Sequence, residues 1–181
     1  MENLREKILE AAVRAFMRFG VNRTRMHDIA SEAGVARQTV YSNYKNKNEI
    51  LCASIRHFSN QSLAAVQKEW SALETLEDKL SAYYKHSIIP SFKVITASPD
   101  ARDMIGGFNA EGKAATLEAQ ATNITACAEM LAHYSFQGHS AEQLAEYLVL
   151  SSLGIRDHAR DETQLLTLLN TQKAGLLALL T

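Results

Sequence analysis

The sequence is poor in the residues that interrupt helices or cross-link small folds. Its 181 residues include two prolines, eight glycines and two cysteines. Cys52 and Cys127 stand alone, without the C-x-x-C spacing of a redox or zinc motif, so we expect two small, reduced core residues. The histidines are scattered and form no metalloprotease motif. The sequence therefore predicts no catalytic residues, no bound metal and no cofactor.

Long hydrophobic runs and strand patterns are also missing. The chain has no run of 18 apolar residues and no signal peptide, so we expect a soluble, cytoplasmic protein without a membrane partner. It has no alternating β-branched runs bounded by turns. Its apolar content of 46% and charged content of 22% are ordinary for a globular protein. These features predict an all-α fold of about nine helices.

Charge is nearly balanced over the whole chain but not along it. The net charge is −1, which by itself argues mildly against a nucleic-acid-binding protein. Residues 1–50 carry nine basic and six acidic side chains, whereas residues 51–181 carry ten basic and fourteen acidic ones. A positive surface is therefore expected near the N-terminus, and the acidic remainder would keep DNA from binding elsewhere.

The most informative segment is residues 24–51, with the sequence TRMHDIASEAGVARQTVYSNYKNKNEIL. Thr24 is a candidate N-cap for a first short helix, and Gly34 is a candidate terminator because glycine adopts the left-handed conformation readily. A second short helix is predicted at about 37–44, and Asn46 with Glu49 has the spacing of a capping box for a third. Two short helices joined by a tight glycine turn are typical of the helix-turn-helix motif.

The predicted second helix carries side chains suited to DNA. Arg37 and Gln38 lie in its first turn, where a recognition helix meets base edges, and these side chains pair with guanine and adenine respectively. Thr39, Tyr41 and Asn43 offer polar groups to phosphates. Lys47 lies in the first turn of the following helix, where amide groups and a cation hold a phosphate together. The alternative is an ordinary surface hairpin of helices.

These residues resemble the DNA-binding domain of the tetracycline-repressor (TetR) family of bacterial transcription regulators. The resemblance covers about residues 5–51 and rests on ILEAAVRAFMRFG, TRMHDIA, AGVARQTVY and NYKNKNEIL. The sequence departs from the family pattern where Ala36 replaces a serine cap. The resemblance implies a DNA-binding domain at 1–46, an effector-binding and dimerisation domain at 47–181, and operator DNA as the partner. The predicted DNA-binding residues are Thr24, Arg25, His27, Arg37, Gln38, Thr39, Tyr41, Ser42, Asn43, Tyr44 and Lys47.

Helical periodicity continues through the rest of the chain. Helices are predicted at about 3–19, 47–71, 76–95, 99–106 and 113–135, followed by two that open at the capping boxes of Ser140 and Asp161. Pro90 should kink or split the helix at 76–95. Ser98 and Pro99 resemble an N-cap and first residue of the next. Residues 106–112 are predicted to be a flexible connector.

A leucine stripe marks the two C-terminal helices. Such a stripe must be buried, either within one chain or against a second copy. The family resemblance implies a homodimer whose four-helix interface holds two DNA-reading motifs one helical turn of DNA apart. The predicted interface residues are Leu144, Leu148, Ser152, Leu165, Leu168, Leu169 and Leu176.

Aromatic and methionine residues gather on the middle helices. Taken singly, such residues are more often core than ligand contacts, but the resemblance places them on the helices that form an effector pocket in the family. Such pockets are mostly apolar with a few polar groups. The candidate ligand-binding residues are Phe58, Trp70, Tyr83, Tyr84, His86, Phe92, Met104, Phe108, Cys127, Met130 and Tyr134.

The sequence therefore predicts a DNA-binding transcriptional regulator, in most family members a repressor, that is released by a small, largely apolar effector. The sequence does not decide between repression and activation. One alternative is an architectural or cell-cycle DNA-binding protein of the same fold that needs no ligand. Another is a helical enzyme or ligand carrier, but the polar face of Arg37, Gln38 and Tyr41 would then have no purpose.

Overall fold

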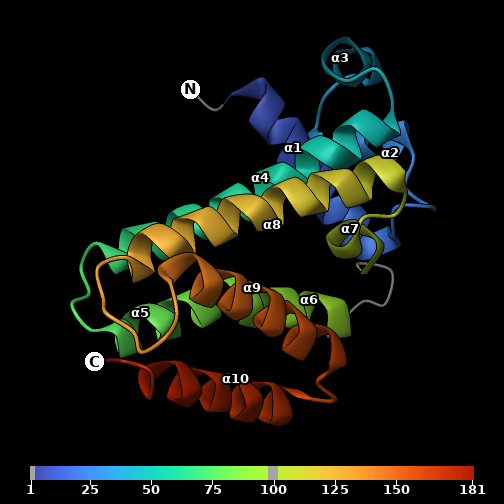
Figure 1. Cartoon of the computed structure of the whole chain (residues 1–181). Coiled ribbons are helices and arrows are strands. Elements are labelled where there is room, and N and C mark those ends of the chain that lie inside the picture. The colour runs from blue at the N-terminus through green and yellow to red at the C-terminus, as the bar shows by residue number, and fades with distance from the viewer. Residues whose placement is uncertain (1–2, 98–101) are drawn as a thin grey trace. The chain divides into compact units, whose positions relative to one another are not determined.

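The computed structural model describes residues 3–97 and 102–181 (Figure 1). In these residues every regular element is a helix, so the predicted all-α fold is confirmed. An isolated antiparallel bridge between Phe136 and Leu180 adds the single β-type pairing of the described chain. None of the described helices is both long enough and apolar enough to cross a membrane.

The chain forms two compact units. The first, called here the N-terminal unit, comprises residues 1–60 and 94–119, and the second, the C-terminal unit, comprises 61–93 and 120–181. Helices α4 (Lys47–Trp70) and α8 (Ala110–Leu131) each contribute residues to both. The predicted functional division at residue 46 stays a prediction.

The N-terminal unit contains α1 (Leu4–Phe19), α2 (Met26–Ala33), α3 (Arg37–Asn43) and α7 (Arg102–Gly106). One face of each of the first two helices is apolar, and these faces meet in a core with the start of α4. Ile8, Phe16, Ile29, Val40 and Ile50 are fully buried in it. Burial of such side chains stabilises the folded state by about 1.5–3 kcal/mol each.

The predicted connector at 106–112 is partly helical. Helix α8 begins at Ala110, three residues earlier than predicted, because the Asn109 side-chain oxygen accepts the Gly112 N–H at 2.8 Å. Gly107 has φ 77°, and a Cβ there would lie 2.5 Å from the Lys113 nitrogen. Only glycine fits this turn without moving the backbone. The helix ends at Leu131 rather than at the predicted 135. The predicted cap at Ser98 and Pro99 lies outside the described residues.

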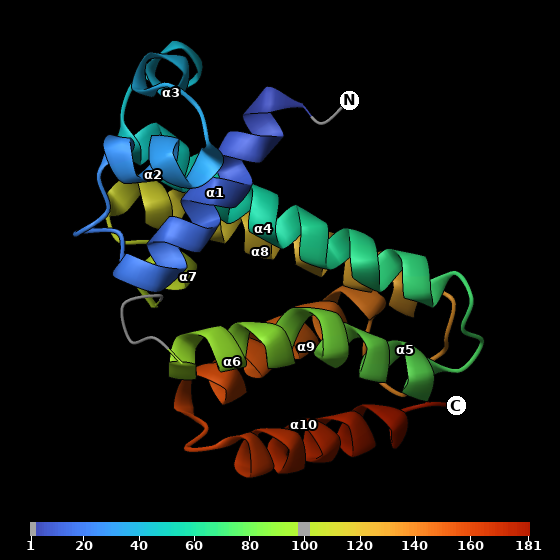
Figure 2. The same ribbon diagram turned by 180° about the vertical axis from the view of Figure 1, so that it is seen from behind.

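The C-terminal unit contains α5 (Leu76–Tyr83), the π-helical turn η1 (Tyr84–Ile88), most of α6 (Ile89–Ala97), α9 (Ala141–His158) and α10 (Glu162–Leu177). Figures 1 and 2 show α10 lying alongside α9 and α5 in both views. The predicted N-caps are confirmed at Ser140 and Asp161, whose side chains accept the Gln143 and Gln164 N–H groups.

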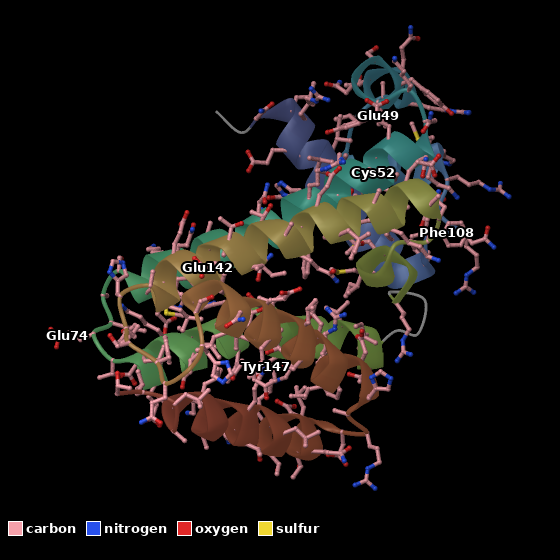
Figure 3. All side chains as sticks on the ribbon, in the orientation of Figure 1. Glu49, Cys52, Glu74, Phe108, Glu142 and Tyr147 are labelled. Atoms are coloured by element: carbon pink, nitrogen blue, oxygen red, sulfur yellow. The ribbon has the colours of Figure 1, made fainter. Side chains whose placement is uncertain are left out.

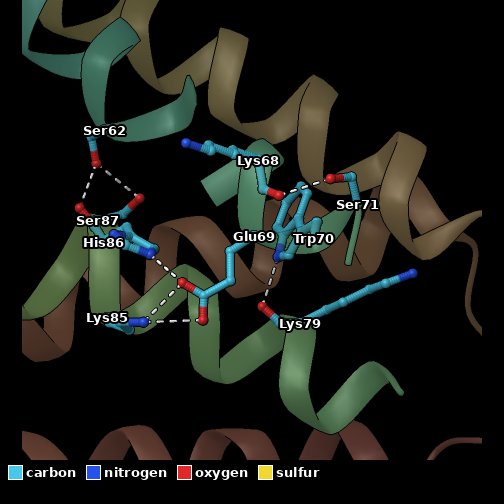
Figure 4. Close-up of polar contacts among 9 residues, drawn as sticks. All are labelled: Ser62, Lys68, Glu69, Trp70, Ser71, Lys79, Lys85, His86 and Ser87. Carbon is cyan, nitrogen blue, oxygen red and sulfur yellow. Dashed lines mark hydrogen bonds and ion pairs between the residues drawn. The ribbon is translucent and has the colours of Figure 1, made fainter. Parts of the chain in front are cut away.

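Pro90 changes the winding of the chain, as predicted, without ending the helical run. Proline has no N–H to donate to the carbonyl four residues earlier, which here is that of His86. The hydroxyl of Ser62, on α4, donates to this carbonyl at 2.6 Å instead (Figure 4). The Ile89 N–H reaches back to the Tyr84 carbonyl in the π-helical pattern. The cost of proline inside the helix is therefore offset by a side-chain donor from another helix.

A buried polar network joins the helices of the C-terminal unit. Gln172 on α10 is 5% exposed, and its side-chain oxygen accepts from the hydroxyls of Tyr84 and Ser152, each at 2.9 Å. Its amide donates to the Leu148 carbonyl and to Ser151. Burial raises the pKa of the Tyr84 hydroxyl, so this hydroxyl stays a donor. Each buried polar atom named here has a partner, which is the condition under which such a network stabilises a fold.

Replacing Gln172 with leucine should lower the free energy of unfolding of this unit by about 1–3 kcal/mol, because Tyr84 and Ser152 lose their acceptor inside the core. Urea unfolding followed by the fluorescence of Trp70, the only tryptophan of the chain, measures the change. Gln67→Leu, at an exposed position of α4, is the matched control and should stay within about 0.5 kcal/mol. Equal stability of the two variants would contradict the role given to the network.

Candidate nucleic-acid interface

The turn between α2 and α3 fixes the angle between these two helices. Gly34 ends α2 in the left-handed conformation, with φ 62° and ψ 38°, as predicted. The Val35 N–H donates to the Ala30 carbonyl at 3.0 Å, which satisfies one of the last carbonyls of α2. Ala36 precedes α3 without any side-chain cap, also as predicted.

The start of α2 differs from the prediction. The helix begins at Met26, and Asp28 accepts the Arg25 N–H at 2.7 Å. Thr24 is not the N-cap, because its hydroxyl donates to the Gly20 carbonyl at 2.7 Å and the side chain is 1% exposed. Thr24 thus holds the turn that follows α1. Its hydroxyl is turned away from solvent, whereas Arg25 and His27 are exposed at the start of α2.

Helix α3 has one buried and one exposed face. Val40 is fully buried and Tyr44, just after the helix, is 2% exposed. The guanidinium of Arg5 lies 5.2 Å from the centre of the Tyr44 ring, a cation–π contact. Tyr44 is therefore an anchor of the motif, and its ring is not part of the exposed face.

The exposed face of α3 carries the predicted base-reading residues. Arg37, Gln38, Tyr41 and Ser42 line one shallow hollow on the surface. The Arg37 guanidinium lies 5.3 Å from the centre of the Tyr41 ring and donates to its hydroxyl at 3.2 Å. This contact directs the side chain of Arg37 towards Tyr41, one helical turn later in α3. The side chain of Gln38 lies beside it on the same exposed surface.

The remaining polar residues of α3 bond to the helix itself. The Ser42 hydroxyl donates to the Gln38 carbonyl at 2.9 Å, and the Asn43 amide donates to the Thr39 carbonyl at 2.8 Å. A hydroxyl that donates in this way still offers its lone pairs, and an amide that donates one hydrogen keeps its oxygen.

The start of α4 is capped and tied to the turn after α1. Asn46 accepts the Glu49 N–H at 2.9 Å, as predicted, while Glu49 accepts the Lys45 N–H at 2.7 Å. The Lys47 ammonium donates to the Val21 carbonyl at 2.7 Å and to the Asn22 carbonyl at 3.1 Å. The sequence did not show this contact, since the partners lie 25 and 26 residues away.

The predicted ligand-binding residues are divided between the two units. Phe58, Met104 and Phe108 belong to the N-terminal unit, and Figure 3 places exposed Phe108 in the turn between α7 and α8. The other eight belong to the C-terminal unit. Six of these are buried in its core, namely Trp70, Tyr83, Tyr84, Phe92, Cys127 and Met130, and Tyr134 packs against them.

The polar groups expected to orient a ligand already bond within the protein. The Trp70 ring N–H donates to the Lys79 carbonyl at 2.7 Å, and the Tyr84 hydroxyl donates to Gln172. His86 contacts the Glu69 carboxylate, which also pairs with Lys85 at 2.9 Å (Figure 4). Lys85 and His86 together lower the pKa of Glu69. Burial raises the pKa of the Cys127 thiol to about 12, as expected for an apolar surrounding.

The predicted dimer residues lie mainly inside their own unit. Six of the seven are 4% exposed or less, namely Leu144, Leu148, Ser152, Leu165, Leu169 and Leu176. Leu168 alone among them is exposed, at 38%. Three further apolar side chains of α9 and α10, outside the predicted set, are exposed: Tyr147, Leu150 and Leu166. Tyr147 and Leu150 lie on the side of α9 away from its buried stripe, whereas Leu166 lies at the edge of the stripe of α10.

Two short helices at a fixed angle, with a polar exposed face on the second, define a protein of the DNA-binding helix-turn-helix class. Residues 8–53 match the family model described as bacterial regulatory proteins, tetR family. The match covers the predicted helix-turn-helix, so this N-terminal part of the chain is a DNA-binding domain of the kind found in this family, as the resemblance in the sequence predicted.

One curated relative is the HTH-type transcriptional regulator TtgR of Pseudomonas putida, which is 46% identical over 52 residues. That match covers 29% of this chain and 25% of the relative. The chain spans between 25% and 42% of the length of the curated relatives that it matches.

Solved structures match over nearly the whole chain, at low sequence identity. A TetR transcription regulator from Haloarcula marismortui has a TM-score of 0.78 at 16% identity and covers 100% of both chains. The transcriptional regulator FadR from Bacillus subtilis, in complex with stearoyl-CoA, has a TM-score of 0.69 at 18% identity and covers 94% of this chain and 96% of its own. These likenesses show the fold.

Replacing Lys47 with alanine should destabilise the N-terminal unit by about 1–2 kcal/mol, because hydrogen bonds from an ammonium to two carbonyls are lost at a half-buried site. Urea unfolding followed by circular dichroism provides the measurement. Lys45→Ala is the control, since Lys45 is exposed two residues away, and it should change stability by less than about 0.5 kcal/mol. A Lys47 variant as stable as the Lys45 variant would mean that the ammonium contributes nothing to the fold.

Proposed function

We propose that the chain is a homodimeric repressor that binds a palindromic operator and is released by a small, largely apolar effector. The observation that carries this proposal is the exposed face of α3. Arg37 and Gln38 offer the donors and acceptors that read guanine and adenine in the major groove. The buried Val40 and Tyr44 hold the opposite face of the motif in the core.

Exposed basic side chains elsewhere in the motif would contact phosphates. Arg25 and His27 are exposed at the start of α2, and Lys45 is exposed just before α4. Lys47 has its ammonium on two carbonyls, so it would contact a phosphate only by sharing or exchanging these partners. Cationic side chains beside a base-reading face set register on DNA without selecting sequence.

A homodimer would supply the second helix-turn-helix motif that a palindromic operator requires. The side chains available for it are Tyr147 and Leu150 on α9 and Leu166 and Leu168 on α10, with exposures of 38–53%. Four exposed apolar side chains on two adjacent helices suit a self-complementary interface, in which each copy presents the same surface. The buried leucines behind them keep these two helices in place.

The effector would enter the C-terminal unit. Its core is rich in aromatic and methionine side chains, and the π-helical turn η1 within it marks a place where helix geometry departs from ideal packing. Helix α4 contains residues of both units, so a change near Trp70 has a continuous helical path to Lys47. The structural neighbour FadR was solved with stearoyl-CoA, which makes a long-chain acyl-CoA the first probe to use.

A ligand-independent architectural protein remains the alternative. It would bind many dispersed sites rather than a few beside promoters, and it would show no coupling between effector and DNA. Mapping of bound sites across the genome distinguishes the two.

Replacing Gln38 with alanine should relax the choice of base at one position in each half-site by about 1–3 kcal/mol, because a bidentate contact to one base is lost. Competition binding against a panel of operators with single-base changes measures this. Gln61→Ala, at an exposed position of α4 in the C-terminal unit, should leave the whole panel unchanged. Equal weakening on every operator by the Gln38 variant would contradict base reading.

Replacing Leu150 with glutamate should yield folded monomers, because an unpartnered charge at an apolar interface is costly to bury. Sedimentation velocity at micromolar concentration gives the oligomeric state, and circular dichroism checks that the helices remain. Leu117→Glu is the control, since Leu117 is 64% exposed on α8 and outside the proposed interface. If Leu150→Glu and Leu166→Glu both sediment as dimers, the interface lies elsewhere.

If the effector releases the protein from its operator, each ligand must lower the affinity of the protein for the other by the same factor. A hundredfold release corresponds to about 2.7 kcal/mol of coupling. Titration of stearoyl-CoA, followed by Trp70 fluorescence with and without operator, should therefore give two different affinities. Equal affinities in the two titrations would show that acyl-CoA is not the effector.

A further inference from the structure

Two carboxylates and an imidazole converge on one spot in the N-terminal unit. Glu6 and Glu10 lie one turn apart on α1, and His57 lies on α4. One ligand atom from each residue lies within 4.8 Å of the other two. Glu6 is exposed, while Glu10 and His57 are half-buried. The cluster is therefore partly accessible to solvent.

One nitrogen of the imidazole, Nε2, lacks a hydrogen-bond partner. The Nε2 atom of His57 is buried from solvent, and so is the hydroxyl of Ser54 three residues earlier on the same face of α4. These two are the buried side-chain polar atoms without a partner in the described part of the chain. A buried polar atom without a partner costs about 1–3 kcal/mol, so such an atom needs a physical explanation.

The two carboxylates are only weakly compensated by a cation. Like charges four residues apart on a helix repel each other. The nearby cation on α1 is Arg14, whose guanidinium lies 3.9 Å from the Glu10 carboxylate. Arg14 makes its shorter bond, 2.9 Å, to Glu32. A cation between Glu6 and Glu10 would relieve the repulsion and could take an imidazole nitrogen of His57 as its third ligand.

We propose that Glu6, Glu10 and His57 bind a divalent transition metal of the zinc type and so join α1 to α4. One imidazole nitrogen and two carboxylate oxygens suit Zn²⁺, and three protein ligands leave a fourth position for water. Ligands of a tetrahedral site with bonds of about 2.1 Å lie about 3.4 Å apart. The three atoms would therefore close by roughly 1 Å on binding, a movement that the exposed Glu6 side chain can supply.

The site lies in the unit that carries α3, and its first ligand, Glu6, follows Arg5, which contacts Tyr44, in the sequence. Its occupant would tie the first turns of α1 to α4 independently of any effector in the C-terminal unit. This inference does not rest on the proposed function, because metal binding by the chain can be measured in the absence of DNA.

The test is calorimetric titration of Zn²⁺ into the full chain, free of any affinity tag and first stripped of metal with a chelator. We expect one Zn²⁺ per chain and a rise in the melting temperature. His57→Ala and Glu10→Gln should each weaken binding by more than about tenfold, because loss of a ligand costs at least as much as loss of a group that orients one. Circular dichroism confirms that each variant is folded.

Two controls separate this site from incidental binding. His133→Ala removes an exposed histidine of the C-terminal unit, and Cys52→Ser removes the thiol on α4 that competes best for zinc. Both should bind as the parent chain does. The proposal is overturned if the parent shows no saturable one-to-one binding, or if His57→Ala and Glu10→Gln bind Zn²⁺ as tightly as the parent.

Discussion

The functional surface depends on how a seven-residue helix is held. An isolated helix as short as α3 is not stable in water. The conformational entropy lost in forming its first turn outweighs the stabilisation from its few backbone hydrogen bonds. Its position comes from the left-handed turn at Gly34 and from the burial of Val40 and Tyr44. A side chain at residue 34 would meet no neighbouring atom, so glycine is required there for its φ angle alone.

Contacts that are distant in sequence complete this support. Thr24 fastens the turn after α1, Lys47 fastens the start of α4 to that same turn, and Arg5 covers the ring of Tyr44. Thr24, Lys47 and Tyr44 are predicted DNA contacts when the sequence is considered alone, since they are polar or basic and lie within residues 24–51. Their hydrogen bonds and ring contact within the protein show that polarity in a small DNA-binding unit also serves to fix its helices.

The sequence predicted helices and caps well because these depend on neighbours three or four residues away. Gly34, Asn46, Ser140 and Asp161 act as predicted. It failed where tertiary packing decides, as at Leu144 and Leu148, whose apolar stripe faces the chain's own core. Periodicity identifies a buried face but not what buries it. The division of the eleven candidate ligand contacts between two units could not be predicted for the same reason. Helical spacing does not indicate which of two hydrophobic cores a residue belongs to.

The central claim is that α3 reads the major groove in two places at once. Protection of guanine N7 from dimethyl sulfate, on a DNA sequence selected by the full chain, tests it directly because N7 lies in the major groove. The account predicts two protected patches whose centres lie about 10 base pairs, or a multiple of that, apart. Absence of a selected sequence, or binding that leaves every guanine N7 reactive, would contradict it.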